Sequence, residues 1–496
     1  MKKRAGPWPL FLFLLPVFFV FHGFVENVRF IRFSDCLPLM GAYCIAALAL
    51  YGLSYVFLKN RIKAALVASF VMAFYLFFGY LHDFLRYHSI FLHRYTILLP
   101  VFLALTVLLT LYLRKRAPFV RLSLFLTILF TAYILFDGIV WVWKVAGKAT
   151  PGPSISLLDP GKYATCDSCP RPDIYLLLFD EYSNSRTLQE RYHYDNSGFD
   201  SFLRSAGFHI QQKSHSNYFI TPFSMASMLN LSYLKGIAHP QDLQPDDYTN
   251  IFDPIRKNEV VNFLMTQGYT IVNNSPFDLP EHPSLIDQPF IAVKTKLITY
   301  RTLTNYLVRD VGAWLQDHLH TPHWVLETGI SQVEHMNETF LTRTMEESGR
   351  RSGSPRFFYC HVMMPHVPFL FDSLGRKRSQ EEIGSTENVA RPDYYLGYLP
   401  YTNSRIRELI TTIKRNSGGQ AVILFMSDHG YRFWPDGIPR PDFFSNQNAV
   451  YYPDGDYSRL YDSISNVNQF RVVFDKLFDL NLPLLKDSTI FLLDKK

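Results

Sequence analysis

Five long apolar stretches follow one another in the first third of the chain, at residues 9–25, 37–58, 64–85, 96–113 and 122–143. Each is close to the length that an α-helix needs to cross a hydrocarbon core of about 30 Å. The first stretch follows a basic start but no small-residue cleavage site, so we expect an uncleaved anchor rather than a removed signal peptide. The pattern predicts a transmembrane domain of five helices over residues 1–148.

The short loops between these stretches differ in positive charge. Lys2, Lys3 and Arg4 precede the first stretch, and the loops at 59–63 and 114–121 hold three and four further Lys or Arg residues. The alternate loops hold two each. Because basic loops stay on the cytoplasmic side and the number of spans is odd, we expect a multi-pass protein of the bacterial cytoplasmic (inner) membrane whose C-terminal domain is extracytoplasmic, in the periplasm.

Charge also separates the two parts of the chain. Residues 1–148 hold 16 Lys and Arg but only 4 Asp and Glu, whereas the rest of the chain has a net charge of −6. An acidic C-terminal part is unsuited to a phosphate backbone, and we expect no nucleic-acid partner. The hydrophobic fraction of 48%, with 43 Phe and 30 Tyr, excludes a disordered or low-complexity chain.

Residues 149–172 are rich in Pro and Gly, as is typical of an extended linker. Cys166 and Cys169 lie within it. Outside the cytoplasm the pair could close a small disulfide, bind a metal with two further ligands, or act in redox chemistry. No second Cys pair and no thioredoxin-like context accompany it in the sequence, which favours a structural disulfide or two idle thiols.

Residues 173–496 alternate between strand-like and helical patterns. Strand-like runs stand at 173–179, 269–272, 357–362, 421–426 and 449–452, and helical segments at 199–206, 224–231, 260–267, 394–414 and 467–478. Fully apolar strands that alternate with helices predict an α/β domain with a mostly parallel central sheet covered on both faces. Ligands bind at the carboxyl ends of the strands in such sheets.

Metal-ligating residues stand at two of these strand ends. Asp180 and Glu181 follow the first strand, and Asp428, His429 and Gly430 follow the run at 421–426. Carboxylate and imidazole together suit Mn²⁺ or Zn²⁺, with Mg²⁺ as an alternative, and glycine allows a sharp backbone turn after them. The alternative interpretation makes Asp428 a helix cap and His429 a surface residue.

A hydroxyl group stands at the predicted start of a helix. Thr221 followed by Pro222 is typical of an N-cap and a first helical residue, and this position favours an alkoxide or a phosphate oxygen. A metal that coordinated the hydroxyl would make it a nucleophile. Thr221 could also be only a cap, and Ser224 is the competing hydroxyl.

Two histidines follow the apolar run at 357–362. His361 lies near the end of the run, and His366 follows in a proline-rich loop. Imidazoles at a strand exit can hold anionic oxygens or protonate a leaving group. A buried histidine in such a run can instead be purely structural, and His361 is the candidate for that role.

These blocks, in this order, resemble the sulfatase/alkaline phosphatase superfamily, and within it the membrane-anchored lipoteichoic acid synthase-like and phosphoethanolamine transferase-like branch. The similarity runs from Pro172 to about Asp487 and includes Tyr401-Thr-Asn403 and the segment 465–471. The resemblance implies a three-layer αβα domain with Thr221 as nucleophile. It implies one divalent metal ion, with Mn²⁺ first among the candidates, bound by Asp180, Thr221, Asp428 and His429.

The resemblance also implies a substrate-binding group. His366 matches a substrate-contacting histidine, and we add His361, Asn403 and Arg432 as further candidates. Glu181 falls where sulfatases of the formylglycine type have a second acidic ligand, so it is a further candidate metal ligand.

One departure from the sulfatase pattern bears on the chemistry. Formylglycine sulfatases need Cys or Ser, one residue, Pro, any residue and Arg, whereas this chain has Thr221-Pro-Phe-Ser-Met225. Threonine cannot become formylglycine, so we expect none. The sequence favours a membrane-anchored phosphotransferase or phosphodiesterase acting on an outer-leaflet lipid or a cell-envelope glycan. The alternatives are a sulfuric ester hydrolase of the same superfamily and a catalytically silent envelope-assembly protein.

Overall fold

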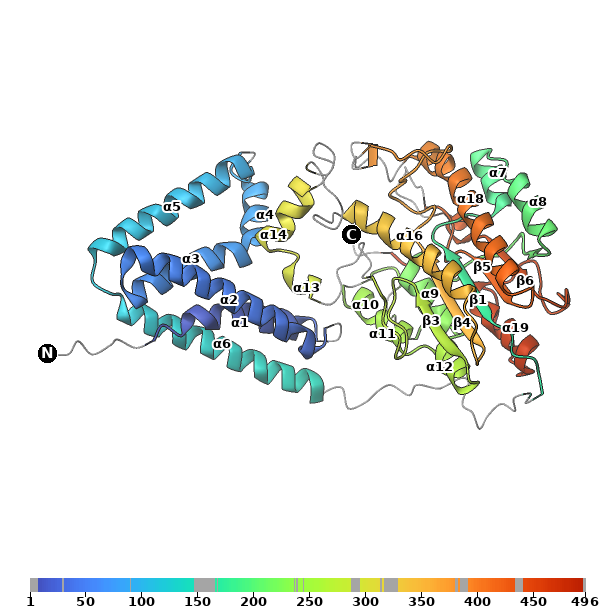
Figure 1. The fold of residues 1–496 in the computed structure, drawn as a ribbon, viewed down its shortest axis with the longest axis horizontal. Helices are drawn as coiled ribbons and strands as arrows, with labels where there is room; N and C mark the ends of the chain where they lie inside the picture. The colour runs from blue at the N-terminus through green and yellow to red at the C-terminus, as the bar shows by residue number, and fades with distance from the viewer. Residues whose placement is uncertain are drawn as a thin grey trace. The chain divides into compact units, whose positions relative to one another are not determined.

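The chain divides into two units in the computed structural model (Figure 1), and each is described by itself. The helical unit comprises Met1–Ser154 and Phe290–Thr328, and the α/β unit comprises Ile155–Pro289 and Gly329–Lys496. The structure describes residues 8–28, 31–89, 91–146, 166, 168–235, 237, 240–243, 245–286, 295–312, 315, 329–379, 382–383, 391–432 and 440–493. Most of the predicted linker at 149–172 lies outside the described residues.

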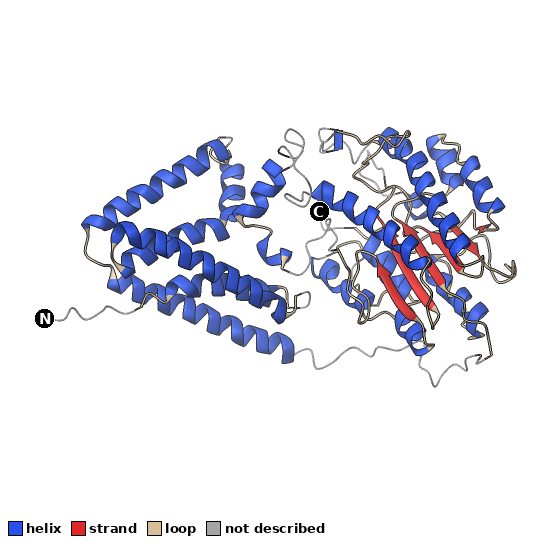
Figure 2. Cartoon of the chain, in the orientation of Figure 1, coloured by secondary structure: helices blue, strands red, loops and turns tan. Residues whose placement is uncertain are grey.

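The N-terminal part of the helical unit is helical throughout most of its described residues (Figure 2). Its helices are α1 (Phe11–Glu26), α2 (Phe33–Leu58), α3 (Arg61–Leu76), α4 (Phe78–His88), α5 (Tyr95–Lys115) and α6 (Val120–Ala146). Among the described residues, α2, α5 and α6 are long and apolar enough to cross a membrane, and α3 with α4 form a fourth candidate. The structure thus supports three or four of the five predicted spans.

The other two predicted spans differ from straight transmembrane helices. The helix α1 has 16 residues and is about 24 Å long at 1.5 Å per residue, and Phe11, Val20 and Phe24 bury it among its neighbours. The helices α3 and α4 meet at a bend of 64°. There the N–H of Gly79 donates to the carbonyl of Arg301, at 2.7 Å, instead of to the preceding turn.

A segment distant in sequence from the N-terminal helices also belongs to the helical unit. This segment, residues 295–312, is called the strap, and it contains α13 (Lys296–Thr299), α14 (Leu303–Leu307) and the π-helical turn η1 (Val308–Gly312). Two glycines allow its close approach: a Cβ at Gly23 would lie 2.9 Å from Ile298, and a Cβ at Gly79 would lie 2.8 Å from the carbonyl oxygen of Arg301. No pattern in the sequence indicated this packing.

The α/β unit is built on one six-stranded sheet. Its strands are β1 (Ile174–Phe179), β2 (His209–Ile210), β3 (Thr270–Asn274), β4 (Arg356–Val362), β5 (Val422–Met426) and β6 (Asn448–Tyr451), in the order β2-β6-β5-β1-β4-β3. The pairings from β3 through β4 and β1 to β5 are parallel, whereas β6 pairs antiparallel with β5 and with β2. The sheet is therefore mixed.

Helices cover both faces of this sheet, as Figure 2 shows. Side chains alternate along β1, so that Leu176 joins one hydrophobic core and Leu177 the other. The helices of the unit are α7 (Ser185–Tyr192), α8 (Ser197–Ser205), α9 (Thr221–Leu229), α10 (Pro245–Asn250), α11 (Phe252–Arg256), α12 (Glu259–Thr266), α16 (Gly329–Ser348), α18 (Pro392–Asn416), α19 (Asn466–Phe478) and the 3₁₀ turn η3 (Pro441–Phe444). Cys166 and Cys169 form a disulfide, which is one of the two outcomes that the sequence favours for them, the other being two idle thiols.

Candidate active site

The two central parallel strands place Asp180 and Asp428 side by side. β1 and β5 are paired neighbours, and each carboxylate follows the last residues of its strand. The backbone N–H of Glu181 donates to Oδ1 of Asp428 at 3.1 Å, which holds the two strand ends together. Both aspartates are almost fully buried, at 1% and 0% exposure.

Asp180, Asp428 and His429 converge on one point. One ligand atom from each residue lies within 4.8 Å of the other two, and Nε2 of His429 lies 3.1 Å from Oδ2 of Asp428. Oδ1 of Asp180 and Oδ2 of Asp428 have no hydrogen-bond partner among the described residues. Two buried carboxylates with unpartnered oxygens repel each other unless a cation offsets their charge, so this donor set fits one divalent ion.

Thr221 lies at the edge of this cluster. Its Oγ1 is 3.4 Å from Oδ2 of Asp180 and 3.2 Å from Nε2 of His429. The prediction that Thr221 is an N-cap was wrong: Ile220 is the N-cap, and Thr221 is the first residue of α9, with Pro222 second. The hydroxyl therefore points away from the helix, toward the metal-ligand cluster. The competing Ser224 instead donates to the carbonyl of Asp428 at 2.7 Å.

Burial and charge shift the pKa values of these ligands in different directions. Burial raises the pKa of Asp428, and the Asp180 carboxylate raises it further. Burial also favours protonation of Asp180, but His366, His361 and His429 together hold its pKa below the usual value. Burial and then Arg432 lower the pKa of His429 to about 4. Near neutral pH His429 is thus a neutral imidazole, which is the form that binds metals.

Glu181 lies beside the cluster, but its backbone conformation directs its side chain toward Arg432. Its φ of +64° is in the left-handed region, which bulky residues rarely adopt. The carboxylate accepts hydrogen bonds from the backbone N–H of Arg432 at 3.1 Å and from its Nε at 3.0 Å. Burial opposes ionisation of Glu181, but Arg432 and then His366 hold its pKa below the usual value. The structure therefore pairs Glu181 with Arg432 and does not include it in the metal-ligand cluster.

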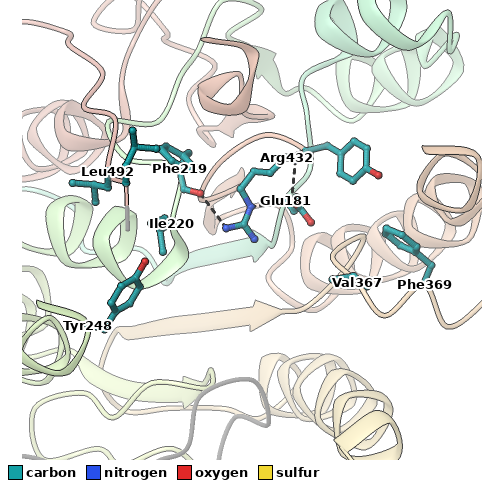
Figure 3. A pocket seen from close by; sticks show the side chains of 10 residues that line it. Glu181, Phe219, Ile220, Tyr248, Val367, Phe369, Arg432 and Leu492 are labelled. Atoms are coloured by element: carbon teal, nitrogen blue, oxygen red, sulfur yellow. Dashed lines mark hydrogen bonds and ion pairs between the residues drawn. The ribbon is translucent and has the colours of Figure 1, made fainter. Parts of the chain in front are cut away.

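Arg432 and Glu181 form the polar floor of a cavity of about 270 Å³ (Figure 3). Nη1 of Arg432 donates to the carbonyl of Phe219 at 3.3 Å, and Nη2 lies 3.1 Å from Nε2 of His366. The walls are apolar and are lined by Phe219, Ile220, Tyr248, Val367, Phe369, Tyr431, Leu492 and Leu493. Ile220 directly precedes Thr221, so the cavity adjoins the head of α9.

The two predicted histidines lie near Asp180 and Glu181. Nε2 of His361 is 3.7 Å from Asp180 and has no hydrogen-bond partner among the described residues. Nε2 of His366 is 3.8 Å from Glu181. Tyr359, which sequence reasoning missed, bonds Nδ1 of His361 at 2.9 Å. Tyr359 stands two residues before His361 in the same strand, and side chains two positions apart in a strand point to the same face. This spacing was the signal in the sequence that could have identified Tyr359.

Asn403 lies apart from this group. It is 8% exposed in α18, donates to Asn196 at 3.0 Å and accepts a hydrogen bond from the hydroxyl of Tyr182 at 2.5 Å. Among the predicted substrate-binding residues, the structure brings His361, His366 and Arg432 to the cluster, whereas Asn403 joins a separate polar network.

The sequence model of the family described as Sulfatase matches residues 180–470, which is more than half of the chain. The chain belongs to the sulfatase family. The matched segment begins at Asp180 and includes Thr221, Asp428 and His429, so the family region contains the whole metal-ligand cluster. No curated protein matches the chain in sequence.

Among solved structures, the chain is similar at low sequence identity to the following proteins. The C-terminal periplasmic domain of EcEptC from Escherichia coli is 11% identical, with 67% of this chain and 93% of that chain covered and a TM-score of 0.39. The corresponding domain of the phosphoethanolamine transferase EptC from Campylobacter jejuni is 12% identical, with coverage of 62% and 90% and a TM-score of 0.37. A phosphonate monoester hydrolase of Agrobacterium radiobacter is 12% identical, with coverage of 64% and 76% and a TM-score of 0.37.

In this member of the family, Gly430 provides space beside the metal-ligand cluster. A Cβ at this position would lie 2.6 Å from the carbonyl oxygen of Ser445 and 2.8 Å from that of Asp442. Its φ is not among the positive values of the chain. Close approach of these two backbone oxygens therefore requires the glycine, and the sharp turn expected after the ligands stays a prediction.

We expect Gly430→Ala to lower the free energy of unfolding by about 1–3 kcal/mol, because the two backbone oxygens must move away from the new methyl group. Thermal unfolding of the full chain measures this loss. Gly198→Ala is the matched control, since no atom lies within 4 Å of a Cβ added there. Equal melting temperatures for the two variants would contradict the packing argument.

The affinity for a divalent metal should fall as the pH is lowered. A metal binds the ionised carboxylate, and Asp428 takes up its proton at a higher pH than an ordinary aspartate, whose pKa is 3.8. Affinity should therefore already fall well above pH 4, by up to about tenfold per pH unit for one displaced proton. Calorimetric titration of EDTA-treated protein with Mn²⁺ between pH 5 and 8 measures this dependence, and a constant affinity would refute it.

Proposed function

We propose that the protein is a membrane-anchored, metal-dependent phosphotransferase or phosphodiesterase that uses Thr221 as its nucleophile. One observation carries the proposal: the Thr221 hydroxyl lies at the head of α9, 3.4 Å from Asp180 and 3.2 Å from His429. The proposal assigns the protein to the lipoteichoic acid synthase-like and phosphoethanolamine transferase-like branch. It places the α/β unit in the periplasm, where a disulfide such as Cys166–Cys169 is stable.

Asp180, Thr221, Asp428 and His429 would hold one divalent ion, with Mn²⁺ first and Zn²⁺ or Mg²⁺ as alternatives. When bound, the ion neutralises negative charge that develops on the phosphoryl group and lowers the pKa of the Thr221 hydroxyl. The donor set supports this assignment, since two carboxylates and one imidazole suit these ions.

The reaction would proceed in two steps on the chain's own residues. Oγ1 of Thr221 loses its proton and attacks phosphorus, the bond from phosphorus to the leaving alcohol breaks, and that alcohol takes up a proton. The resulting phosphothreonine then passes its phosphoryl group to an acceptor hydroxyl or to water, and Thr221 regains its proton. His361 and His366 would hold the phosphoryl oxygens or protonate the leaving alcohol.

An outer-leaflet lipid is the proposed donor, with a cell-envelope glycan as a further acceptor or substrate. The cavity beside Thr221 supports a lipid, because apolar side chains surround a floor of Arg432 and Glu181. The apolar helices of the helical unit support a location at the membrane, where substrate is local to the site.

Hydrolysis of chromogenic esters tests the reaction class. Full-length protein in detergent, treated with EDTA, is assayed on p-nitrophenyl phosphodiester and p-nitrophenyl sulfate with and without Mn²⁺. We expect Mn²⁺-dependent release from the phosphodiester and no comparable release from the sulfate. Faster release from the sulfate would support the sulfuric ester hydrolase instead. No turnover of either ester, together with no bound metal by elemental analysis, would support the silent envelope-assembly protein.

A further inference from the structure

The helical unit contains a second cavity, of about 430 Å³. Its walls are Phe18, His22 and Glu26 of α1, Tyr80 of α4, and Tyr300 and Arg301 of the strap, among others. None of the residues of the metal-ligand cluster lines it. The cavity is therefore a separate feature that the proposed chemistry does not explain.

Three elements build this cavity. The C-terminal half of α1 forms one wall, and Phe77 and Tyr80 form another at the bend between α3 and α4. The strap closes the cavity through Leu297, Ile298 and Arg301. In Figure 1, α14 lies beside α4, and α13 contacts α1. The bend between α3 and α4 and the close contacts at Gly23 and Gly79 bring these three elements together. The cavity therefore results from the packing of the helical unit.

Charged groups of both signs line the cavity. The Arg301 guanidinium stacks 4.3 Å from the ring centre of Tyr80 and is 32% exposed. Among the described residues it makes one hydrogen bond, from Nε to the hydroxyl of Tyr300 at 2.9 Å, and the carboxylate of Asp83 is 4.0 Å away. Nη1 is thus in an ion pair with Asp83, and Nη2 is the group that can donate to an anion. Glu26 offers an exposed carboxylate at the end of α1.

The remaining walls suit an amphiphile at a membrane surface. Phe18, Phe77, Tyr80 and Tyr300 give the cavity an aromatic lining, and aromatic side chains are enriched where membrane meets water. His22 is held by Asp137 of α6 at 3.1 Å, so that carboxylate already has a partner. The distribution of basic loops places the C-terminal end of α1 at the outer surface.

We propose that this cavity binds the headgroup of a zwitterionic phospholipid of the outer leaflet, with the phosphate on Arg301 and a primary ammonium on Glu26. A guanidinium is the preferred partner of a phosphate, and a carboxylate selects an ammonium over a neutral glycerol. The aromatic side chains would contact the glycerol and the upper acyl chains. This lipid is retained and not consumed, so the site is independent of the role of Thr221.

Native mass spectrometry of the full chain in detergent tests the site, with phosphatidylethanolamine, phosphatidylglycerol or diacylglycerol added. Wild-type protein should retain phosphatidylethanolamine best and diacylglycerol least. Arg301→Gln should lower retention of both phospholipids by about tenfold, since a charged hydrogen bond of about 1.4 kcal/mol corresponds to tenfold in affinity. Glu26→Gln should lower only the preference for phosphatidylethanolamine over phosphatidylglycerol, by a similar factor.

One control and one independent cavity variant make the result decisive. Arg94→Gln removes an exposed arginine that stacks on Phe91 in the same unit but does not line the cavity, and it should leave retention unchanged. Glu26→Gln changes an exposed side chain and tests the site even if Arg301→Gln disturbs the strap. Equal retention of the three lipids, or equal retention by wild type and both cavity variants, would overturn the proposal. Displacement of the lipid by millimolar inorganic phosphate would also overturn it, by assigning the site to a free anion.

Discussion

Thr221→Ala is expected to lower Mn²⁺-dependent turnover of a phosphodiester by at least about a thousandfold, because the variant has no atom that can form the bond to phosphorus. The substituted side chain is small and 5% exposed at the first position of α9, so the fold should persist. Steady-state assay of full-length protein at saturating Mn²⁺ measures the loss.

Two further variants test whether Thr221 acts as a nucleophile or is only a buried threonine. Thr221→Ser keeps the hydroxyl and should retain measurable turnover. Thr342→Ala removes a hydroxyl that bonds Glu338 on the exposed face of α16, at 3.3 Å, and should have wild-type activity. Thr221→Ala protein that keeps wild-type activity would exclude the nucleophile assignment. So would Thr221→Ser protein that is as inactive as the alanine variant while folded and metal-bound.

Removal of the metal is expected to lower the melting temperature of the α/β unit. A ligand that binds only the folded state stabilises it by about 2.7 kcal/mol at a hundred times its dissociation constant. The melting temperature should therefore fall in EDTA and recover when Mn²⁺ or Zn²⁺ is added. Calorimetry of the full chain, with elemental analysis of the metal before chelation, provides the measurement.

Asp428→Asn should abolish this response. The amide can still accept the hydrogen bond from Glu181 through Oδ1, but it loses the charge that binds the ion and that repels Asp180. The variant should thus melt below metal-loaded wild type and no lower than EDTA-treated wild type. Asp462→Asn is the matched control, since Asp462 is exposed and its Oδ1 accepts from the N–H of Gln212, at 2.8 Å, away from the metal-ligand cluster. A metal response that survives in Asp428→Asn would remove Asp428 from the ligand set.

The α/β fold could be predicted because its strands are short, apolar and far apart in sequence. The runs that contain β1, β4 and β5 are apolar on both faces, which occurs where helices cover a sheet on both sides. The two-residue strand β2 and the direction of β6 could not be predicted. A strand of His209 and Ile210 has too few residues to show a period, and pairing direction depends on contacts distant in sequence.

The sequence could predict those parts of the candidate site that lie at the ends of strands. Asp180 and Asp428 follow strands that proved to be neighbours, so the topology alone brings them together. The pairing of Glu181 with Arg432 could not be predicted, because it depends on the left-handed backbone at Glu181, and local sequence does not indicate that conformation in a glutamate. The same holds for Asn403, whose partners Tyr182 and Asn196 come from other elements.

The helical unit shows a different limit of prediction from the sequence. Hydropathy measures length and polarity, and it treats residues 64–85 as one span. The bend between α3 and α4 instead depends on a backbone carbonyl of Arg301, which lies more than 200 residues away along the chain. Such a contact leaves no periodic signal in either segment.

A fragment of the protein that starts after the linker would still contain the strap. In the full chain Ile298 and Tyr306 are 5% and 4% exposed, because Ile298 meets Gly23 of α1 and the Tyr306 hydroxyl donates to Asp83 of α4 at 2.9 Å. Without those helices both side chains would lose these partners and face water, so we expect the fragment to bind to detergent micelles and vesicles. We expect a water-soluble form of the α/β unit to require removal of residues 295–312 as well as the N-terminal helices.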